Sequence, residues 1–230
     1  MQFDETPSSQ SVESLKVFTF KDEEETENEI EVKIPEVVDP AYGMYVWPSA
    51  PVLAQYIWKK RKWIFGKRVL ELGAGTALPG ILAAICGAVV TLSDHSRYPR
   101  CLENCLKSCQ ANDLRDSVDI VGLSWGEFPP GIFQLPTFDV ILASDCFYDT
   151  KDFENVLATI VFFLEKGTTT RCWIGYQERS SDRSLDQLLI RWGLHCLHIP
   201  LGVFGADGPS VAGSNLPGHH SIQLLEITQL

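Results

Sequence analysis

Hydrophobic and polar residues are distributed along the chain in a way that predicts alternating strands and helices. Short apolar runs are typical of buried strands, and a helical period of apolar positions follows most of them. Strands are expected at 68–73, 89–94, 117–122, 138–144, 171–176, 194–199 and 221–228, with helices at about 78–87, 97–112, 152–165 and 181–192. This alternation predicts an α/β fold with a doubly wound, Rossmann-like sheet of seven strands.

The two ends of this pattern differ from its centre. Residues 201–220 are rich in Gly, Pro and Ser and are too few for a helical crossover, so the last strand is expected to run antiparallel to its neighbour. Near the N-terminus, alternating segments at 15–20 and 30–34 flank an acidic turn and predict a β-hairpin. The chain is therefore divided into a disordered N-terminus (1–14), an acidic hairpin and linker (15–43) and a main domain (44–230) that opens with a helix from about Pro48.

A glycine turn follows the first strand of the main domain. Gly73 and Gly75 flank Ala74, and a dinucleotide fingerprint would need a third glycine at Leu78, so NAD is disfavoured. Glu71 lies two residues before the first glycine. This spacing resembles motif I of class I S-adenosylmethionine-dependent methyltransferases, and the resemblance implies S-adenosylmethionine as cofactor and S-adenosylhomocysteine as product.

Asp94 ends the next strand about twenty residues downstream, where a carboxylate can accept both hydrogen bonds of a ribose diol. A simple helix cap is the alternative for an acid in this position. Trp125 follows the third strand and is a candidate adenine contact, with ordinary core packing as its alternative.

Two motifs carry a closer resemblance. The sequence Trp47-Pro48-Ser49 and the sequence Asp145-Cys146-Phe147-Tyr148 after the fourth strand resemble methyltransferase family 16, a group of seven-strand protein methyltransferases. The resemblance covers about residues 44–228. It implies cofactor contacts at Trp47, Gly73 to Gly75, Asp94, Trp125 and Ala143, and a methyl-acceptor site at Asp145 to Tyr148. Cys146 departs from the aliphatic residues usual at its position.

Further segments resemble one branch of this family, namely 44–48, 78–84, 141–145, 176–177 and 179–180. This resemblance implies a protein arginine methyltransferase that acts on histone tails in the nucleus and cytoplasm, with chromatin or chaperone proteins as possible partners. Protein-lysine methylation is the first alternative. A non-catalytic interaction protein that retains the cofactor fold is the second.

Methyl transfer to a cationic nitrogen requires groups that orient the substrate and accept a proton. Asp145, Asp149 and Glu178 are the candidate acids, and Tyr148 is a candidate wall of the acceptor channel because aromatic rings bind cations. Asp149 could instead cap the following helix, and Glu178 could pair with a nearby arginine.

Charge and composition disfavour nucleic-acid binding, a membrane span and a metal site. The formal net charge is −11, and residues 1–43 hold twelve acids against three bases, so most of the negative charge lies outside the main domain. This sign disfavours direct nucleic-acid binding. Seven cysteines without an export signal indicate a reducing compartment, and no apolar run is long enough to cross a membrane. Cys101, Cys105 and Cys109 span about 12 Å of a helix and are expected to pack rather than to bind metal.

Overall fold

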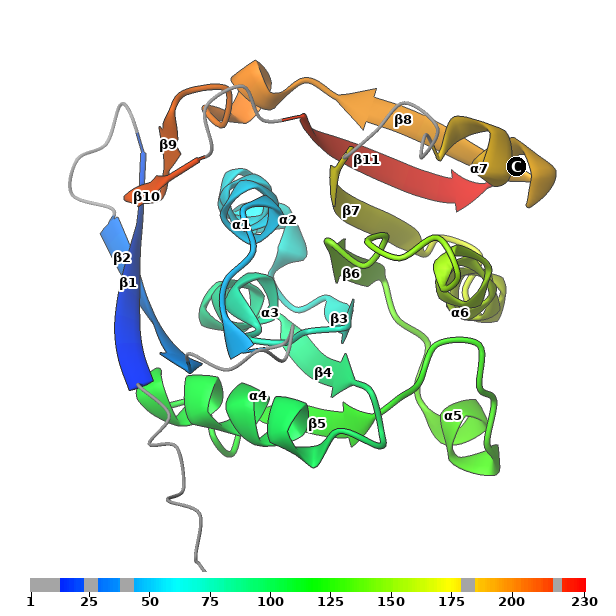
Figure 1. Ribbon diagram of the computed structural model, residues 1–230, viewed down its shortest axis with the longest axis horizontal. Helices are drawn as coiled ribbons and strands as arrows, with labels where there is room; N and C mark the ends of the chain where they lie inside the picture. The colour runs from blue at the N-terminus through cyan, green and yellow to red at the C-terminus, as the bar shows by residue number, and fades with distance from the viewer. Residues whose placement is uncertain (1–12, 23–28, 38–43, 179–184, 217–220) are drawn as a thin grey trace, which may run out of the picture.

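A seven-stranded sheet forms the centre of the molecule (Figure 1). The computed structural model describes residues 13–22, 29–37, 44–178, 185–216 and 221–230. The strand order is β5-β4-β3-β6-β7-β11-β8, and β11 runs antiparallel to both of its neighbours while the other pairs are parallel. The strands are β3 (Arg68–Leu72), β4 (Val89–Asp94), β5 (Val118–Gly122), β6 (Val140–Ser144), β7 (Arg171–Gln177), β8 (Leu194–Ile199) and β11 (Ile222–Gln229). The predicted fold class and the antiparallel last strand are confirmed.

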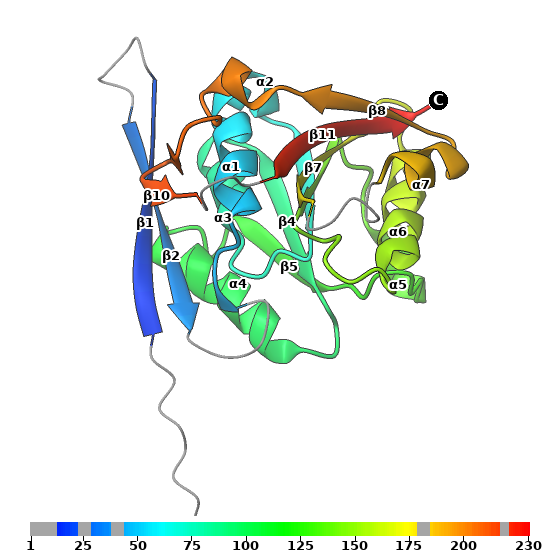
Figure 2. The ribbon, with the colours of Figure 1, turned by 45° about the horizontal axis from the view of Figure 1, so that its top comes forward.

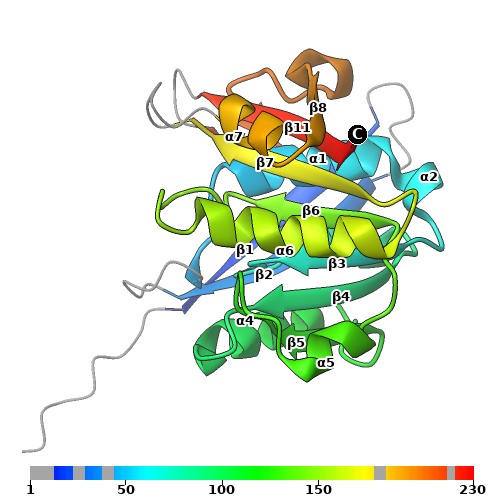
Figure 3. The same cartoon turned by 90° about the vertical axis from the view of Figure 1, so that its right-hand side faces the viewer.

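Helices cover both faces of this sheet, as Figure 3 shows for α6 in front of the strands. They are α1 (Ser49–Lys59), α2 (Arg61–Ile64), α3 (Leu78–Ile85), α4 (Pro99–Ala111), α5 (Pro130–Gln134), α6 (Phe153–Lys166) and α7 (Asp186–Arg191). Successive strand residues point to opposite faces. Val140 and Leu142 therefore join the core cluster that contains α1 and α3, whereas Ile141 and Ala143 join the cluster that contains α6.

The helix expected at 181–192 is represented by α7, and residues 181–184 lie outside the described residues. The helix expected to begin at about Pro48 is two helices, α1 and α2, with a break at Lys60. The structure also adds α5, a 3₁₀ turn η3 (Leu201–Phe204) and the short ribbon of β9 (Ser210–Val211) and β10 (Ser214–Asn215). Within the described segments, no helix combines the length and apolar character that a membrane span needs.

The N-terminal hairpin, β1 (Glu13–Lys21) with β2 (Glu29–Val37), stands against the helices of one sheet face (Figure 2). Its inward residues Phe18, Phe20, Val32 and Ile34 belong to the same buried cluster as α1 and α3. The backbone N–H of Thr19 also donates to the carbonyl of Ala212, which joins β1 to the β9–β10 ribbon. β1 begins two residues inside the segment expected to be disordered, because its ladder with β2 extends to Glu13.

One carboxyl group is buried between the sheet and α3. Glu71 Oε2 accepts a hydrogen bond of 2.9 Å from the backbone N–H of Gly80, in the first turn of α3. That turn leaves backbone N–H groups without partners inside the helix, and the carboxyl group satisfies one of them. Burial, with a smaller contribution from Asp94, raises the pKa of Glu71 to about 8 although the hydrogen bond from Gly80 lowers it. Glu71 is therefore mostly protonated near neutral pH.

This raised pKa makes the stability of the ligand-free protein depend on pH. Between about 4.5 and 8 the folded chain holds a proton on Glu71 that the unfolded chain has released. The free energy of unfolding should therefore fall as the pH rises through this window, by up to about 1.4 kcal/mol per pH unit from this group. Glu71→Gln should remove that part of the decline in denaturant unfolding, and Glu103→Gln, an exposed change on α4, should keep it. Parallel curves for the parent and Glu71→Gln would contradict a neutral Glu71.

Candidate active site

A cavity of about 590 Å³ opens at the carboxyl ends of β3, β4, β5 and β6. Residues that follow each of these strands line it, beginning with Gly73, His95, Leu123 and Asp145. The segment before α1 closes another side with Met44, Tyr45 and Trp47. Ligands of open α/β sheets bind at this edge, and the volume suits a ligand of nucleoside size.

Asp94 organises one end of the cavity. Its Oδ2 accepts a hydrogen bond of 2.8 Å from the N–H of Gly75, and its Oδ1 accepts one of 2.7 Å from the N–H of His95. Burial raises the pKa of Asp94, and these backbone bonds together with the Cys101 thiol oppose that rise. A carboxylate offers about four acceptor sites, so Asp94 retains acceptor capacity for ligand hydroxyl groups.

The glycine turn, Gly73 to Gly75, follows β3 and lies against the ring of Trp125. Gly73 has a φ of 57°, a conformation that glycine adopts without strain, and Gly75 has a φ of 54°. A Cβ at Gly73 would lie 2.6 Å from the Trp125 ring. The missing side chain therefore allows the tryptophan to pack directly on the turn.

Asp145 organises the other end. Its side chain lines the cavity, the residue is only 5% exposed, and its backbone has a φ of 53°, which is uncommon outside glycine. The backbone N–H donates to the carbonyl of Gly175 at 2.8 Å, which fixes the turn after β6 to β7. Residues held in such sparsely populated conformations gather at functional sites.

Aromatic side chains line the same cavity as this acid. The rings of Tyr45 and Trp47 lie 4.6 Å apart, and those of Trp125 and Tyr148 lie 6.3 Å apart. Burial, assisted by the charge of Asp152, raises the pKa of Tyr148 to about 12, so its hydroxyl stays protonated at neutral pH and can donate a hydrogen bond. Aromatic faces and a buried carboxylate together suit a cationic group.

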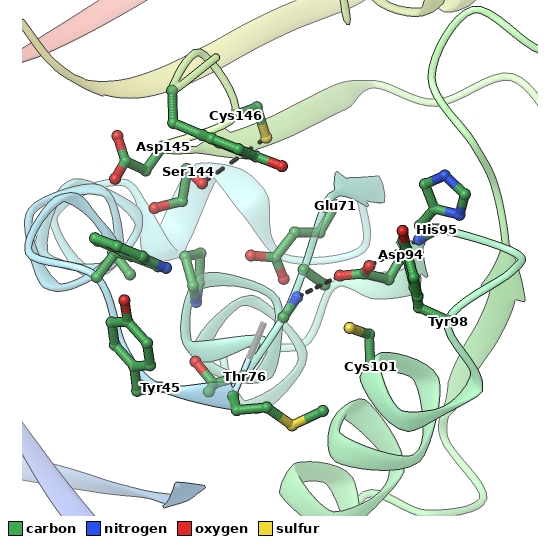
Figure 4. A pocket seen from close by; sticks show the side chains of 18 of the residues that line it. Tyr45, Glu71, Thr76, Asp94, His95, Tyr98, Cys101, Ser144, Asp145 and Cys146 are labelled. Carbon is green, nitrogen blue, oxygen red and sulfur yellow. Dashed lines mark hydrogen bonds between the residues drawn. The ribbon is translucent and has the colours of Figure 1, made fainter. Parts of the chain in front are cut away.

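Figure 4 shows the two ends of the cavity with Glu71 between them. Asp94, His95, Tyr98 and Cys101 gather at one end. Asp145, Ser144 and Tyr45 lie toward the other. The arrangement offers separate places for a ribose-bearing ligand and for a second, cationic ligand.

Nine of the twelve candidate site residues line the cavity: Trp47, Glu71, Gly73, Ala74, Gly75, Asp94, Trp125, Asp145 and Tyr148. Ala143, Asp149 and Glu178 are not among its lining residues. Ala143 is buried within the α6 cluster, and its neighbour Ser144 lines the cavity instead. Asp149 accepts a hydrogen bond from the N–H of Lys151 just before α6, and Glu178 accepts one from Gln223 of β11. Their predicted catalytic roles remain predictions.

The structure adds lining residues that the sequence interpretation did not select, among them Tyr45, His95, Tyr98, Arg100 and Cys101. His95 directly follows a predicted strand end, so position alone could have indicated it. Tyr98, Arg100 and Cys101 lie at the start of α4, and no motif marks them. Among the residues that the structure describes, no group of three or more His, Cys, Asp or Glu side chains is placed to hold a metal ion.

These residues fit the cofactor that the motifs imply. Asp94 offers acceptors for a ribose, Trp125 an apolar surface for a base, and the glycine turn a backbone without bulky side chains.

Comparison with solved structures identifies the fold. The 16S rRNA methyltransferase RsmC of T. thermophilus, solved with AdoMet and guanosine, superposes with a TM-score of 0.59 over 94% of this chain and 51% of that chain, at 14% identity. A putative RNA methyltransferase of Pyrococcus horikoshii gives 0.56 over 84% and 92%, also at 14% identity.

Sequence comparison identifies the family. The histone-arginine methyltransferase METTL23 of Xenopus laevis is 52% identical over 88% of this chain and 86% of its own length, and that of Homo sapiens is 51% identical over 80% and 97%. The protein N-lysine methyltransferase METTL21A of Danio rerio is 32% identical over 66% and 70%. A family model described as lysine methyltransferase matches residues 26–187. The chain therefore belongs to this methyltransferase family, and its cofactor is S-adenosylmethionine.

Proposed function

We propose that this methyltransferase transfers a methyl group to arginine side chains of histones, in the nucleus and cytoplasm. The observation that carries the proposal is the buried carboxylate of Asp145 in a cavity walled by Tyr45, Trp47 and Tyr148. A guanidinium is planar, pairs with a carboxylate through two hydrogen bonds and stacks on aromatic rings. The names of the relatives at 51–52% identity support arginine and histone as the acceptor.

The sulfonium of the bound cofactor supplies an activated methyl group, so the protein mainly has to position the acceptor nitrogen. In this proposal Asp145 orients the cationic side chain and balances its charge as a proton leaves the nitrogen. Tyr148, protonated at neutral pH, donates a hydrogen bond rather than acting as a base. The rings of Tyr45 and Trp47 exclude water from the same end of the cavity.

Lysine is the second candidate acceptor. The family model is described as lysine methyltransferase, and the METTL21A relatives are named for lysine. An ammonium group also binds aromatic faces and needs only one carboxylate, which Asp145 supplies. The same site therefore suits both acceptors, and only the methylated product distinguishes them.

The decisive experiment supplies methyl-labelled S-adenosylmethionine, core histones and, separately, a cell lysate, with mass spectrometry of the labelled residue. We expect label on histone arginine. Label on lysine would replace the proposed acceptor by the alternative. Complete absence of label, from a preparation that binds S-adenosylhomocysteine, would favour a non-catalytic protein.

Asp145→Asn should lower turnover by about 10²-fold or more, because the amide neither balances the acceptor's charge nor accepts its proton. Asparagine tolerates the left-handed backbone, so the fold should persist. Asp113→Asn is a matched control, since Asp113 has a φ of 58° and is exposed at the end of α4. Cofactor affinity, measured by calorimetry, should stay unchanged in both variants. Full turnover by Asp145→Asn would remove the proposed role.

Asp94→Asn should weaken binding of S-adenosylhomocysteine by about 1–3 kcal/mol, through the loss of charge-assisted hydrogen bonds. One amide oxygen remains to accept from the backbone of the glycine turn, which limits damage to the loop. Asp119→Asn, an exposed change on the adjacent strand β5, serves as the control in the same titration. Equal affinities of the two variants would show that Asp94 does not bind the ribose.

A further inference from the structure

The N-terminal hairpin carries an acid on its inward face. Residues Val32, Ile34 and Glu36 alternate along β2 and are all buried, so Glu36 occupies a position where the pattern favours an apolar side chain. The residue is 7% exposed. Burying a carboxylate is costly unless it is paired and hydrogen-bonded, so its partners determine why it is tolerated there.

Two partners meet this carboxylate. Glu36 Oε1 accepts a hydrogen bond of 2.7 Å from the backbone N–H of Val46, and Lys16 Nζ of β1 lies 3.1 Å from the same oxygen. The Lys16 side chain is half exposed, so solvent screens that ion pair. The short bond to Val46 is consequently the more specific of the two contacts.

Val46 lies between two of the aromatic residues that line the cavity. Tyr45 and Trp47 flank it in the sequence, and their rings contact one another at 4.6 Å. The same segment continues into α1, where Ser49 Oγ lies 3.1 Å from Ser144 Oγ, the residue before Asp145. The backbone that Glu36 holds is therefore joined to the acid end of the cavity.

Contacts other than that of Glu36 hold the hairpin in place. Asn112, which follows α4, accepts from the N–H of Lys33 at 2.9 Å and donates to its carbonyl at 2.7 Å. Arg61 of α2 forms an ion pair with Asp22 at 2.5 Å. The Asn112 bonds fix β2 to the end of α4, and the ion pair fixes the end of β1 to α2, so a side chain that extends from β2 can act as a rigid support.

We propose that Glu36 is a positioning residue for the methyl-acceptor end of the cavity. Its carboxylate fixes the backbone of Val46 and thereby holds Tyr45 and Trp47 as an aromatic wall beside Asp145. The hairpin thus contributes to binding of the acceptor without touching it. This role applies equally to an arginine and a lysine acceptor.

Two substitutions separate the hydrogen bond from the charge. Glu36→Gln keeps an acceptor oxygen at full reach but removes the charge, whereas Glu36→Asp keeps the charge and shortens the side chain by about 1.5 Å. Glu31→Asp is the control, because Glu31 is exposed on the same strand. Hydrogen exchange of the Val46 amide, affinity for S-adenosylhomocysteine and acceptor kinetics are measured for each. The kinetics use core histones, or the labelled lysate protein if histones remain unlabelled.

We expect Glu36→Asp to speed exchange at Val46 about tenfold and to raise the acceptor KM about tenfold. Its kcat should change less than about threefold, and its affinity for S-adenosylhomocysteine, a ligand that Trp47 is also predicted to contact, should change by less than its acceptor KM, while Glu36→Gln and Glu31→Asp behave like the parent. Unchanged exchange at Val46, or an unchanged KM, in Glu36→Asp would overturn the proposal. A loss of cofactor affinity as large as the rise in acceptor KM, together with a lower melting temperature, would also overturn it, by showing a general structural role. Failure of the parent to label histones affects only the proposed acceptor, since exchange at Val46 is read independently.

Discussion

The structure of the site depends on one buried hydrogen bond, which joins the carboxyl group of Glu71 to the N–H of Gly80. The bond connects the end of β3 to the first turn of α3, and the residues between them form the turn that lines the cavity. A Cβ at Gly80 would lie 2.4 Å from Glu71 Oε2 and equally close to Leu92. Gly80 is therefore required beside the acid of motif I, because any side chain at this position would collide with Glu71 and Leu92.

The N-terminal hairpin, which lies outside the seven-stranded sheet, also supports the site. Its phenylalanines complete the core over α1 and α3, while Glu36 of β2 reaches the segment that walls the cavity. The two strands of the hairpin thus present an apolar inward face, while Glu13, Glu29 and Glu31 are exposed on them. The number of acids in this segment therefore does not reveal that one of them, Glu36, points inward and binds the backbone N–H of Val46.

The sequence predicted the elements whose patterns are long and regular, because burial on both faces of a parallel sheet requires continuous apolar runs. β3, β4 and β6 lie within or at the expected bounds. Short elements such as α5 and the β9–β10 ribbon carry too few residues to show a period. Asp94 and Asp145 were predicted as site residues from their positions at strand ends, because the parallel topology brings these strand ends to one edge of the sheet. Tyr98 and Cys101 were not predicted as site residues, because their contact with the cavity depends on where α4 crosses that edge. The positions of the Asp149 and Glu178 side chains depend on hydrogen bonds to Lys151 and Gln223, which residue spacing in the sequence does not reveal.

Side-chain donors satisfy carbonyl groups in and beside the glycine turn. The Cys105 thiol donates to the carbonyl of Gly75 at 3.4 Å, and Ser108 Oγ donates to that of Thr76 at 2.8 Å, both from α4. On the other side of the turn, the Cys146 thiol donates to the carbonyl of Leu72 at 3.2 Å. Cys105 is buried as its helical spacing predicted, but it also forms a polar contact that composition cannot reveal. With these carbonyl groups satisfied and the N–H of Gly75 bound to Asp94, the turn is fixed before any ligand arrives, so binding need not supply the free energy of ordering it.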